Sequence, residues 1–283
     1  MQIDTQFDER TSTLTHVVWD EATRDAVVID PVLDFDPASG RVWTESLDRV
    51  LATVRQQQLR VHWVLETHAH ADHLSGSQGL VRDCGAKLAV GGNITAVQQV
   101  FREVFGLSSM QVDGRQFDHL LTDGEVLQAG ALRVTALATP GHTAACMSFL
   151  ARDAVFTGDT LFHEDVGVGR CDFPGGSADQ LFTSVTERLY RLPDATRVFP
   201  GHDYPSGRPW RPDTTIAAEK KGNVQLSAAT HRQDFIDRRT ARDRSLGPPR
   251  LLYPSLQVNI AGGRLPEAGP NGRRYLLTPV SGL

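Results

Sequence analysis

The stretch ETHAHADHLSG, residues 66–76, places His68, His70, Asp72 and His73 within six consecutive positions. Imidazole nitrogens and carboxylate oxygens are common metal ligands in proteins. Residues two apart on an extended segment point the same way, so His68 and His70 can converge on one ion. Packing does not require such a cluster, because histidine is an awkward core residue and imidazolium charges repel each other. The cluster therefore predicts a metal site.

Three further donors follow in order, His142 in TPGHT, Asp159 in FTGDT and His202 in PGHDY. Each comes after an apolar run and beside a glycine, which lets the backbone approach an ion closely. Taken singly, each has an ordinary structural alternative, since an aspartate can organise a turn and a histidine can cap a strand. Taken together, they predict one shared centre. The remaining histidines lack such neighbours and are predicted to be structural or exposed: His16, His62, His119, His163 and His231.

Alternating apolar runs and amphipathic segments predict the elements that position these donors. We expect a hairpin over 16–32 with its turn at 20–25, and strands over 61–66, 87–92, 124–143 (two), 146–162 (two) and 196–204. Helices are expected over 46–59, 94–105 and 178–192. Residues 73–85 are also expected to form a helix, with Asp72 available to cap its start. All predicted donors then lie just past strand ends, where loops held by a sheet often carry catalytic groups.

The overall composition is that of an ordinary globular protein. The 283 residues are 40% apolar and 22% charged, with a net charge of −5, which argues against a nucleic-acid partner. No apolar run approaches the roughly 18 residues of a membrane span, and the N-terminus has no apolar signal core. The odd set of Cys84, Cys146 and Cys171 makes no disulfide framework. A cytoplasmic protein is expected.

The composition changes beyond Tyr204. Several prolines are followed by a charged stretch over 234–245 and by PSLQVN at 254–259. We expect residues 1–204 to form the catalytic domain. Residues 205–283 are expected to be a C-terminal extension packed on that domain, with one or two helices and no recognisable site.

The ordered donors resemble those of the metallo-β-lactamase superfamily, over a match from about Thr15 to Tyr204. This resemblance implies an α+β fold, the αββα sandwich, with the metal site at one edge. It also implies two metal pockets with Asp159 able to bridge them. The first pocket would contain His68, His70 and His142, and the second Asp72, His73 and His202.

The segment GRCDFPGG, 169–176, together with the PSLQVN segment, resembles bacterial persulfide dioxygenases that carry a C-terminal extension. That resemblance implies an enzyme that oxidises glutathione persulfide with O2 to sulfite and glutathione. It implies one Fe(II) per chain on His68, His142 and Asp159, the two-histidine, one-carboxylate arrangement of non-haem iron oxygenases. The other donors, His70, Asp72, His73 and His202, would form an outer shell.

Four residues are candidates for contacts with the substrate. Arg170 is predicted to grip the glutathione carboxylate through its bidentate fork, with an ion pair to Asp172 as the structural alternative. Tyr204 is predicted to hydrogen-bond the substrate, or else to pack in the core. Cys171 lies near the substrate in one interpretation and is an inert buried thiol in the other.

Two other functions stay open at this stage. A binuclear zinc hydrolase of glutathione thioesters would use the same donors, because every ligand type of the superfamily is present. Glyoxalase II enzymes share GDTLF but resemble this chain less after Arg170, and they end in a helical glutathione-binding domain not recognised in 205–283. A non-catalytic metal-dependent sensor is the third possibility. The resemblance allows a homodimer, although no segment argues for one.

Overall fold

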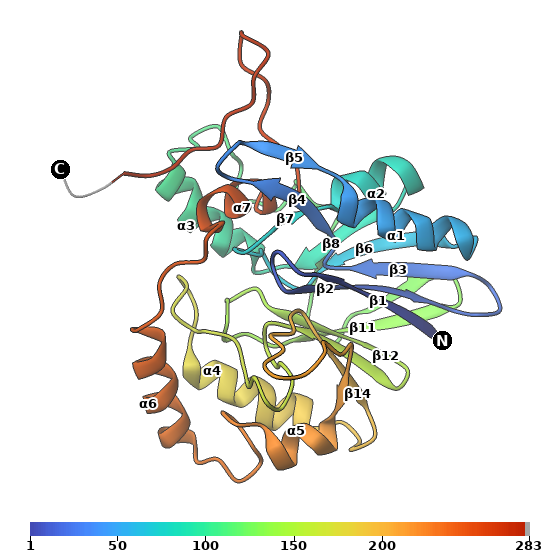
Figure 1. Cartoon of the computed structure of the whole chain (residues 1–283), viewed down its shortest axis with the longest axis vertical. Coiled ribbons are helices and arrows are strands. Elements are labelled where there is room, and N and C mark those ends of the chain that lie inside the picture. Colours follow the sequence, from blue (N-terminus) through green and yellow to red (C-terminus); the bar gives the residue numbers. More distant parts are fainter. Residues whose placement is uncertain (281–283) are drawn as a thin grey trace.

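The computed structural model describes residues 1–280 and is a layered α/β sandwich (Figure 1). The first sheet has the strand order β1 (Gln2–Asp8), β2 (Thr13–Trp19), β3 (Asp25–Ile29), β6 (Arg60–Glu66), β8 (Lys87–Gly91), β9 (His119–Leu121). The second has the order β10 (Val126–Ala129), β11 (Leu132–Ala138), β12 (Met147–Ala151), β13 (Ala154–Gly158), β14 (Arg197–Pro200), β15 (Thr214–Thr215). A small third sheet joins β5 (Arg41–Trp43), β4 (Val32–Asp36) and β7 (Leu74–Ser75).

Helices cover both outer faces of the sandwich (Figure 1). The first sheet is covered by α1 (Glu45–Gln56), α2 (Ser77–Cys84), α3 (Ile94–Phe105) and α7 (Leu252–Asn259). The second is covered by α4 (Ala178–Thr183), α5 (Ile216–Gly222) and α6 (Arg232–Asp243). The predicted αββα architecture is therefore confirmed. Within residues 1–280 no helix combines the length and the apolar character that crossing a membrane requires.

Strands β2, β3 and β8 of the first sheet are buried on both faces, which explains their nearly continuous apolar runs. Val17 and Val64 pack toward the helices, while their neighbours Val18 and Leu65 pack between the two sheets. This alternation follows from the two-residue period of a strand. The sheets are thus fixed against each other, and the loops at their ends are carried by a rigid core.

The helix expected directly after the histidine cluster begins later than predicted. Leu74 and Ser75 pair as β7 with Leu33 and Val32 of β4, so α2 starts only at Ser77. A Cβ at Gly76 would lie 2.8 Å from the carbonyl oxygen of Val32, and only glycine permits that approach. Asp72 therefore caps no helix, and the expectation that it does was wrong. The strand pairing leaves residues 67–73 as a loop.

The predicted helix over 178–192 is also interrupted. It is α-helical in α4, widens to π geometry over Ser184–Arg188 and ends in a 3-10 turn at Leu189–Arg191. Leu181, Val185 and Leu189 are buried at a constant spacing of four residues. An α-helix would rotate such a series off one face, whereas the wider turn keeps it against the core.

The C-terminal segment, 205–280, contains three helices, although one or two were expected. The last of them, α7, contacts the loop of residues 67–73, which we call the histidine loop. Asn259, at the end of α7, is 5% exposed. Its amide nitrogen donates to the carbonyl oxygens of His70 and His73, both at 2.8 Å, and its oxygen accepts from the Ser75 N–H at 2.8 Å. Because buried backbone groups must be paired, one side chain satisfies three positions of a loop without regular structure. The extension therefore holds the loop in place.

We expect Asn259→Asp to lower stability by about 1–3 kcal/mol, since the carboxylate keeps the bond from Ser75 but can donate to neither carbonyl. Metal affinity should fall about 10- to 100-fold, as for other residues that support ligands. Thermal unfolding and metal retention against a chelator measure the two effects. Gln257→Glu is the matched control, because Gln257 is equally buried on α7 but bonds Tyr253 and Leu277. Equal metal loss in both variants would contradict the assignment.

Candidate metal centre

The predicted donors converge at one edge of the sandwich because each follows a strand that ends there. His68 follows β6, His142 follows β11, Asp159 follows β13 and His202 follows β14. At the β13 end, Gly158 has φ +49°, and a Cβ there would lie 2.4 Å from Thr67 Oγ1. Glycine is therefore required for Asp159 to turn toward the histidine loop.

One set of donors is grouped tightly. A ring nitrogen of His68, one of His142 and a carboxylate oxygen of Asp159 all lie within 4.8 Å of one another. His142 Nε2 is 3.6 Å from Asp159 Oδ2. Two imidazoles and one carboxylate thus face a common point.

The tautomer of His68 is fixed from behind by a chain of hydrogen bonds. Thr67 Oγ1 donates to Asp30 Oδ2 at 2.7 Å, so the hydroxyl is left to accept from His68 Nδ1 at 3.0 Å. His68 Nε2 then carries the lone pair and points toward the centre. Neutral imidazole with one nitrogen held by a partner is the usual form of a metal ligand.

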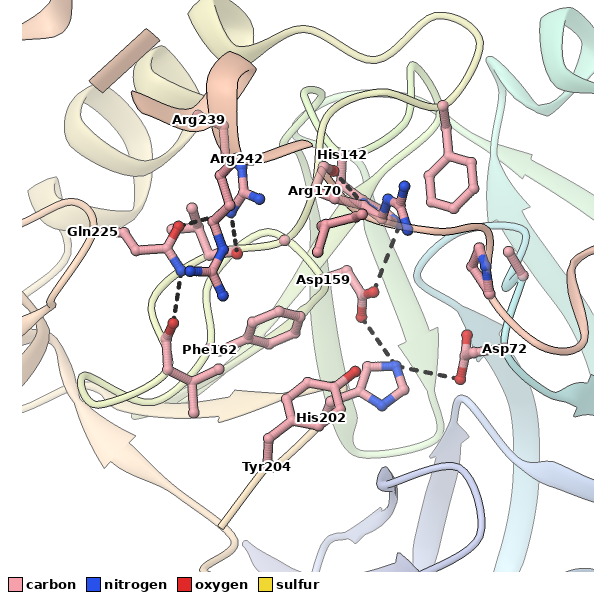
Figure 2. A pocket seen from close by; sticks show the side chains of 17 residues that line it. Asp72, His142, Asp159, Phe162, Arg170, His202, Tyr204, Gln225, Arg239 and Arg242 are labelled. Carbon is pink, nitrogen blue, oxygen red and sulfur yellow. Dashed lines mark hydrogen bonds and ion pairs between the residues drawn. The ribbon is translucent and has the colours of Figure 1, made fainter. Parts of the chain in front are cut away.

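Backbone carbonyls fix two further rings in the same way. His142 Nδ1 donates to the Arg170 carbonyl at 2.7 Å, and His202 Nδ1 donates to the Ser12 carbonyl at 3.1 Å. Since a carbonyl only accepts, Nδ1 of each ring carries a proton, and Nε2 of each ring faces Asp159. His202 Nε2 lies 3.4 Å from both Asp159 Oδ1 and Asp72 Oδ2, as Figure 2 shows.

Burial and neighbouring charges set the protonation states. Burial lowers the pKa of His68 and of His70 well below the ordinary value, which keeps both rings neutral. Burial alone would raise the pKa of Asp159, but the neighbouring imidazoles, His202 first, hold it below its usual value. The carboxylates of Asp159 and Asp72 raise the pKa of His202, although burial alone would lower it. In the first group, Asp159 is thus anionic and His68 is neutral, as metal ligands must be.

His70 packs its ring against His68, at a centroid distance of 4.0 Å, and its ring nitrogens also lie near other donors. It groups with Asp72 and His73, and on its other side with the buried carboxylates Asp30 and Glu66. Its Nε2 is 3.0 Å from Asp30 Oδ1 and 3.7 Å from Glu66 Oε2. His73 Nδ1 is 3.0 Å from Asp72 Oδ2. The seven donors therefore include one close group, His68, His142 and Asp159, and a neighbouring group, His70, Asp72 and His73.

Several of these atoms are buried with no hydrogen-bond partner among residues 1–280. They are His68 Nε2, both ring nitrogens of His70, His73 Nε2 and Asp159 Oδ1. Buried polar atoms are rarely left unpaired, because each costs the full loss of its hydration. Unpaired nitrogen and oxygen atoms gathered in one place fit a metal ion, and the donor set accordingly supports a metal cofactor.

A pocket of about 280 Å³ opens onto this centre (Figure 2). Asp72, His142, Asp159, His202 and Tyr204 line its metal end. Phe162, Val166, Val168, Phe173, Leu246 and Pro249 form apolar walls. Arg170, Gln225, Arg239 and Arg242 complete the lining, and the last three come from the C-terminal extension.

The predicted substrate residues lie at different distances from this pocket. Arg170 lines it, but Nε and Nη2 bind Asp172 at 2.6 and 2.7 Å, and Nη1 donates to the Gly247 carbonyl at 2.8 Å. Tyr204 lines it too, with its ring stacked on His202 at a centroid distance of 5.5 Å. Cys171 is buried in the core and does not line the pocket, and burial raises the pKa of its thiol well above the ordinary value.

Sequence reasoning missed several residues that support or line the site. Asp30 follows the β3 strand as the donors follow theirs, so the strand-end pattern already contained that signal. Asn259, Arg239 and Arg242 were missed because the extension was expected to carry no site. Nothing local marks them as site residues, since Asn259 bonds residues 184 to 189 positions away and the two arginines meet the pocket only through the fold.

Comparison with known proteins agrees with the geometry. Residues 9–202 match the family model described as the metallo-beta-lactamase superfamily. The chain is 45% identical over 278 residues to a beta-lactamase hydrolase-like protein of Xylella fastidiosa, covering 98% of this chain and 64% of that protein. It is 44% identical to a probable metallo-hydrolase of Burkholderia pseudomallei, with full coverage of both chains.

Two further similarities concern persulfide dioxygenases and a solved structure. The mitochondrial persulfide dioxygenase ETHE1 of Bos taurus is 34% identical over 200 residues, which is 70% of this chain and 66% of that protein. The crystal structure of ETHE1 from Myxococcus xanthus is 35% identical and superposes with a TM-score of 0.75, covering 93% of this chain and all of that one. With its fold, its donors and these relatives, the chain belongs to the metallo-beta-lactamase superfamily.

Proposed function

We propose that this protein is a non-haem iron persulfide dioxygenase that oxidises glutathione persulfide with O2 to sulfite and glutathione. One observation carries the proposal, the close grouping of His68, His142 and Asp159 around a common point. Two histidines and one carboxylate are the ligand set of non-haem Fe(II) oxygenases. The chain is also similar to ETHE1 proteins, and the one from Bos taurus is named a persulfide dioxygenase. This similarity supports the same reaction.

The overall reaction balances without an external reductant. Glutathione persulfide, O2 and water give glutathione and sulfurous acid, which ionises to sulfite. The outer sulfur loses four electrons and O2 gains four, while the sulfur–sulfur bond breaks and the inner sulfur takes up a proton. A ferrous ion held by the three ligands would supply the redox chemistry that lets O2 react with a sulfur donor.

The residues around the donors have separate tasks in this proposal. The apolar walls, including Phe162 and Phe173, keep water from the reacting sulfur. Stacking on His202 fixes the Tyr204 ring, and its hydroxyl has no partner in the part of the chain that the structure describes. That hydroxyl is therefore free to hydrogen-bond the substrate. Holding sulfur and O2 side by side raises their effective concentration.

A two-zinc hydrolase of glutathione thioesters is the second candidate. It is favoured by Asp159 Oδ1, which lies 3.4 Å from His202 Nε2 and so also faces the second group of donors. In such an enzyme, metal-bound water is the nucleophile. The hydrolase names of the Xylella and Burkholderia relatives agree with this alternative.

The direct test is metal analysis and oxygen consumption on protein purified without oxidation. We expect one iron per chain and uptake of one O2 for each sulfite formed from glutathione persulfide. An oxygen electrode and a sulfite assay measure the stoichiometry. Two zinc ions per chain together with thioester cleavage, and no O2 uptake by the iron-loaded protein, would contradict the proposal in favour of the hydrolase.

A pair of variants separates the two candidates. Asp159→Ala should lose most of its iron and its activity while the circular dichroism spectrum stays that of the folded protein, because one of three ligands is removed. Asp72→Ala is the matched control, since Asp72 belongs to the neighbouring group. We expect Asp72→Ala to keep one iron per chain. Full iron occupancy in Asp159→Ala, or loss of one of two metals in Asp72→Ala, would overturn the ligand assignment.

A further inference from the structure

We propose that α6 builds an anion-binding subsite beside the metal centre, in which Arg242 and Arg238 hold the carboxylate or phosphate end of the thiol substrate. The inference rests on the proposed function for the identity of that substrate. In this proposal the C-terminal extension binds the charged end of the substrate, while the sandwich supplies the metal ligands.

The subsite is a second pocket that borders the metal pocket. It has a volume of about 280 Å³ and is lined by Val224, Gln225, Phe235, Arg238, Arg239 and Arg242. Gln225, Arg239 and Arg242 line both pockets, so the two share a wall. Figure 2 shows Gln225, Arg239 and Arg242 together on one side of the metal pocket, away from Asp72. Because Arg242 lines the metal pocket as well, a ligand in that pocket meets α6 at this residue.

The other arginines near this wall already have partners. Arg239 is 3% exposed and binds Asp243, Gln225 and the Val168 carbonyl. Arg170 uses its fork on Asp172. Arg232, on the first turn of α6, pairs with Asp179 and Glu187. These guanidinium groups are occupied by protein.

Arg238 and Arg242 differ from them. Neither side chain makes a hydrogen bond or ion pair with any residue in 1–280. They lie four residues apart, so both project from one face of α6, where like charges repel. The helix dipole favours a cation in the last turn, which accounts for Arg242 but not for Arg238. Two unpaired guanidinium groups at the wall of a pocket fit an anion.

The order of chemical groups along the pocket then indicates which kind of ligand fits it. Metal donors lie at one end, apolar side chains form the middle and cations lie at the other end. A thiol derivative with its sulfur at the metal and an anionic group at the far end matches this order. A tripeptide thiol offers carboxylates and a nucleotide-linked thiol offers phosphates, and either would bind the same guanidinium groups.

The test is the steady-state kinetics of Arg242→Gln on the iron-loaded full chain, with direct binding of glutathione followed by calorimetry. We expect KM for glutathione persulfide and Kd for glutathione to rise about 10- to 100-fold, since a charge-assisted bond is lost, while kcat and iron content stay close to the parent values. Arg242→Lys should recover part of the loss. Arg244→Gln is the control, because Arg244 is exposed just beyond α6 and lines neither pocket.

Three substrates distinguish the sources of the anion. The persulfides of glutathione, of coenzyme A and of uncharged 2-mercaptoethanol are compared on the parent and on Arg242→Gln. If Arg242→Gln weakens the reaction of glutathione persulfide alone, the bound anion is a carboxylate. If it weakens the reaction of coenzyme A persulfide more, the bound anion is a phosphate. An equal loss for the uncharged persulfide, or an equal effect of Arg244→Gln, overturns the subsite.

The binding arm also separates this inference from the proposed function. If no persulfide is oxidised but glutathione or coenzyme A binds and Arg242→Gln weakens that binding, the subsite stands and the dioxygenase assignment fails. If persulfide is oxidised but Arg242→Gln leaves KM and Kd unchanged, the dioxygenase stands and the subsite fails. Binding of neither thiol by the parent protein overturns the subsite whatever the reaction.

Discussion

The buried carboxylate of Asp30 is the constraint on which the metal centre depends. It accepts from both the N–H and the hydroxyl of Thr67 at 2.7 Å, at the end of the parallel pair β3 and β6. A buried carboxylate is costly unless it is hydrogen-bonded, so these bonds are enforced by the fold itself. The Thr67 hydroxyl then has only its acceptor role left, which fixes His68. The first ligand is therefore oriented by the first sheet.

The second sheet and the C-terminal segment supply the other residues of the site. His142, Asp159 and His202 arrive on loops of the second sheet, and Asn259 holds the first loop from α7. Arg239 and Arg242 bring α6 to the pocket. The metal donors and the α6 side of the pocket wall thus come from different stretches of chain. This division explains how one donor set can serve several chemistries on the same scaffold.

The sequence predicted what depends on local pattern. The donors could be placed at strand ends because apolar runs stop just before them, and α1 and α3 follow from the spacing of their apolar residues. The start of α2 could not be placed, because β7 exists only through pairing with β4, some forty positions earlier. Asn259 bonds residues 184 to 189 positions away. No local pattern encodes contacts of that range.

His70 lies between the two groups of donors, with its ring centroid 4.0 Å from that of His68 and 4.3 Å from that of His73. Its Nε2 is 3.0 Å from Asp30 Oδ1, so one edge of the ring faces the buried acidic pair Asp30 and Glu66. Burial and the nearby charge of Asp30 raise the pKa of Glu66 well above its usual value, which favours the protonated form of Glu66 in this pair. The other edge of the ring faces Asp72, with Nδ1 4.0 Å from Oδ1. His70 therefore connects the carboxylate that orients His68 to the second group of donors, so a change at Asp30 would act on both groups.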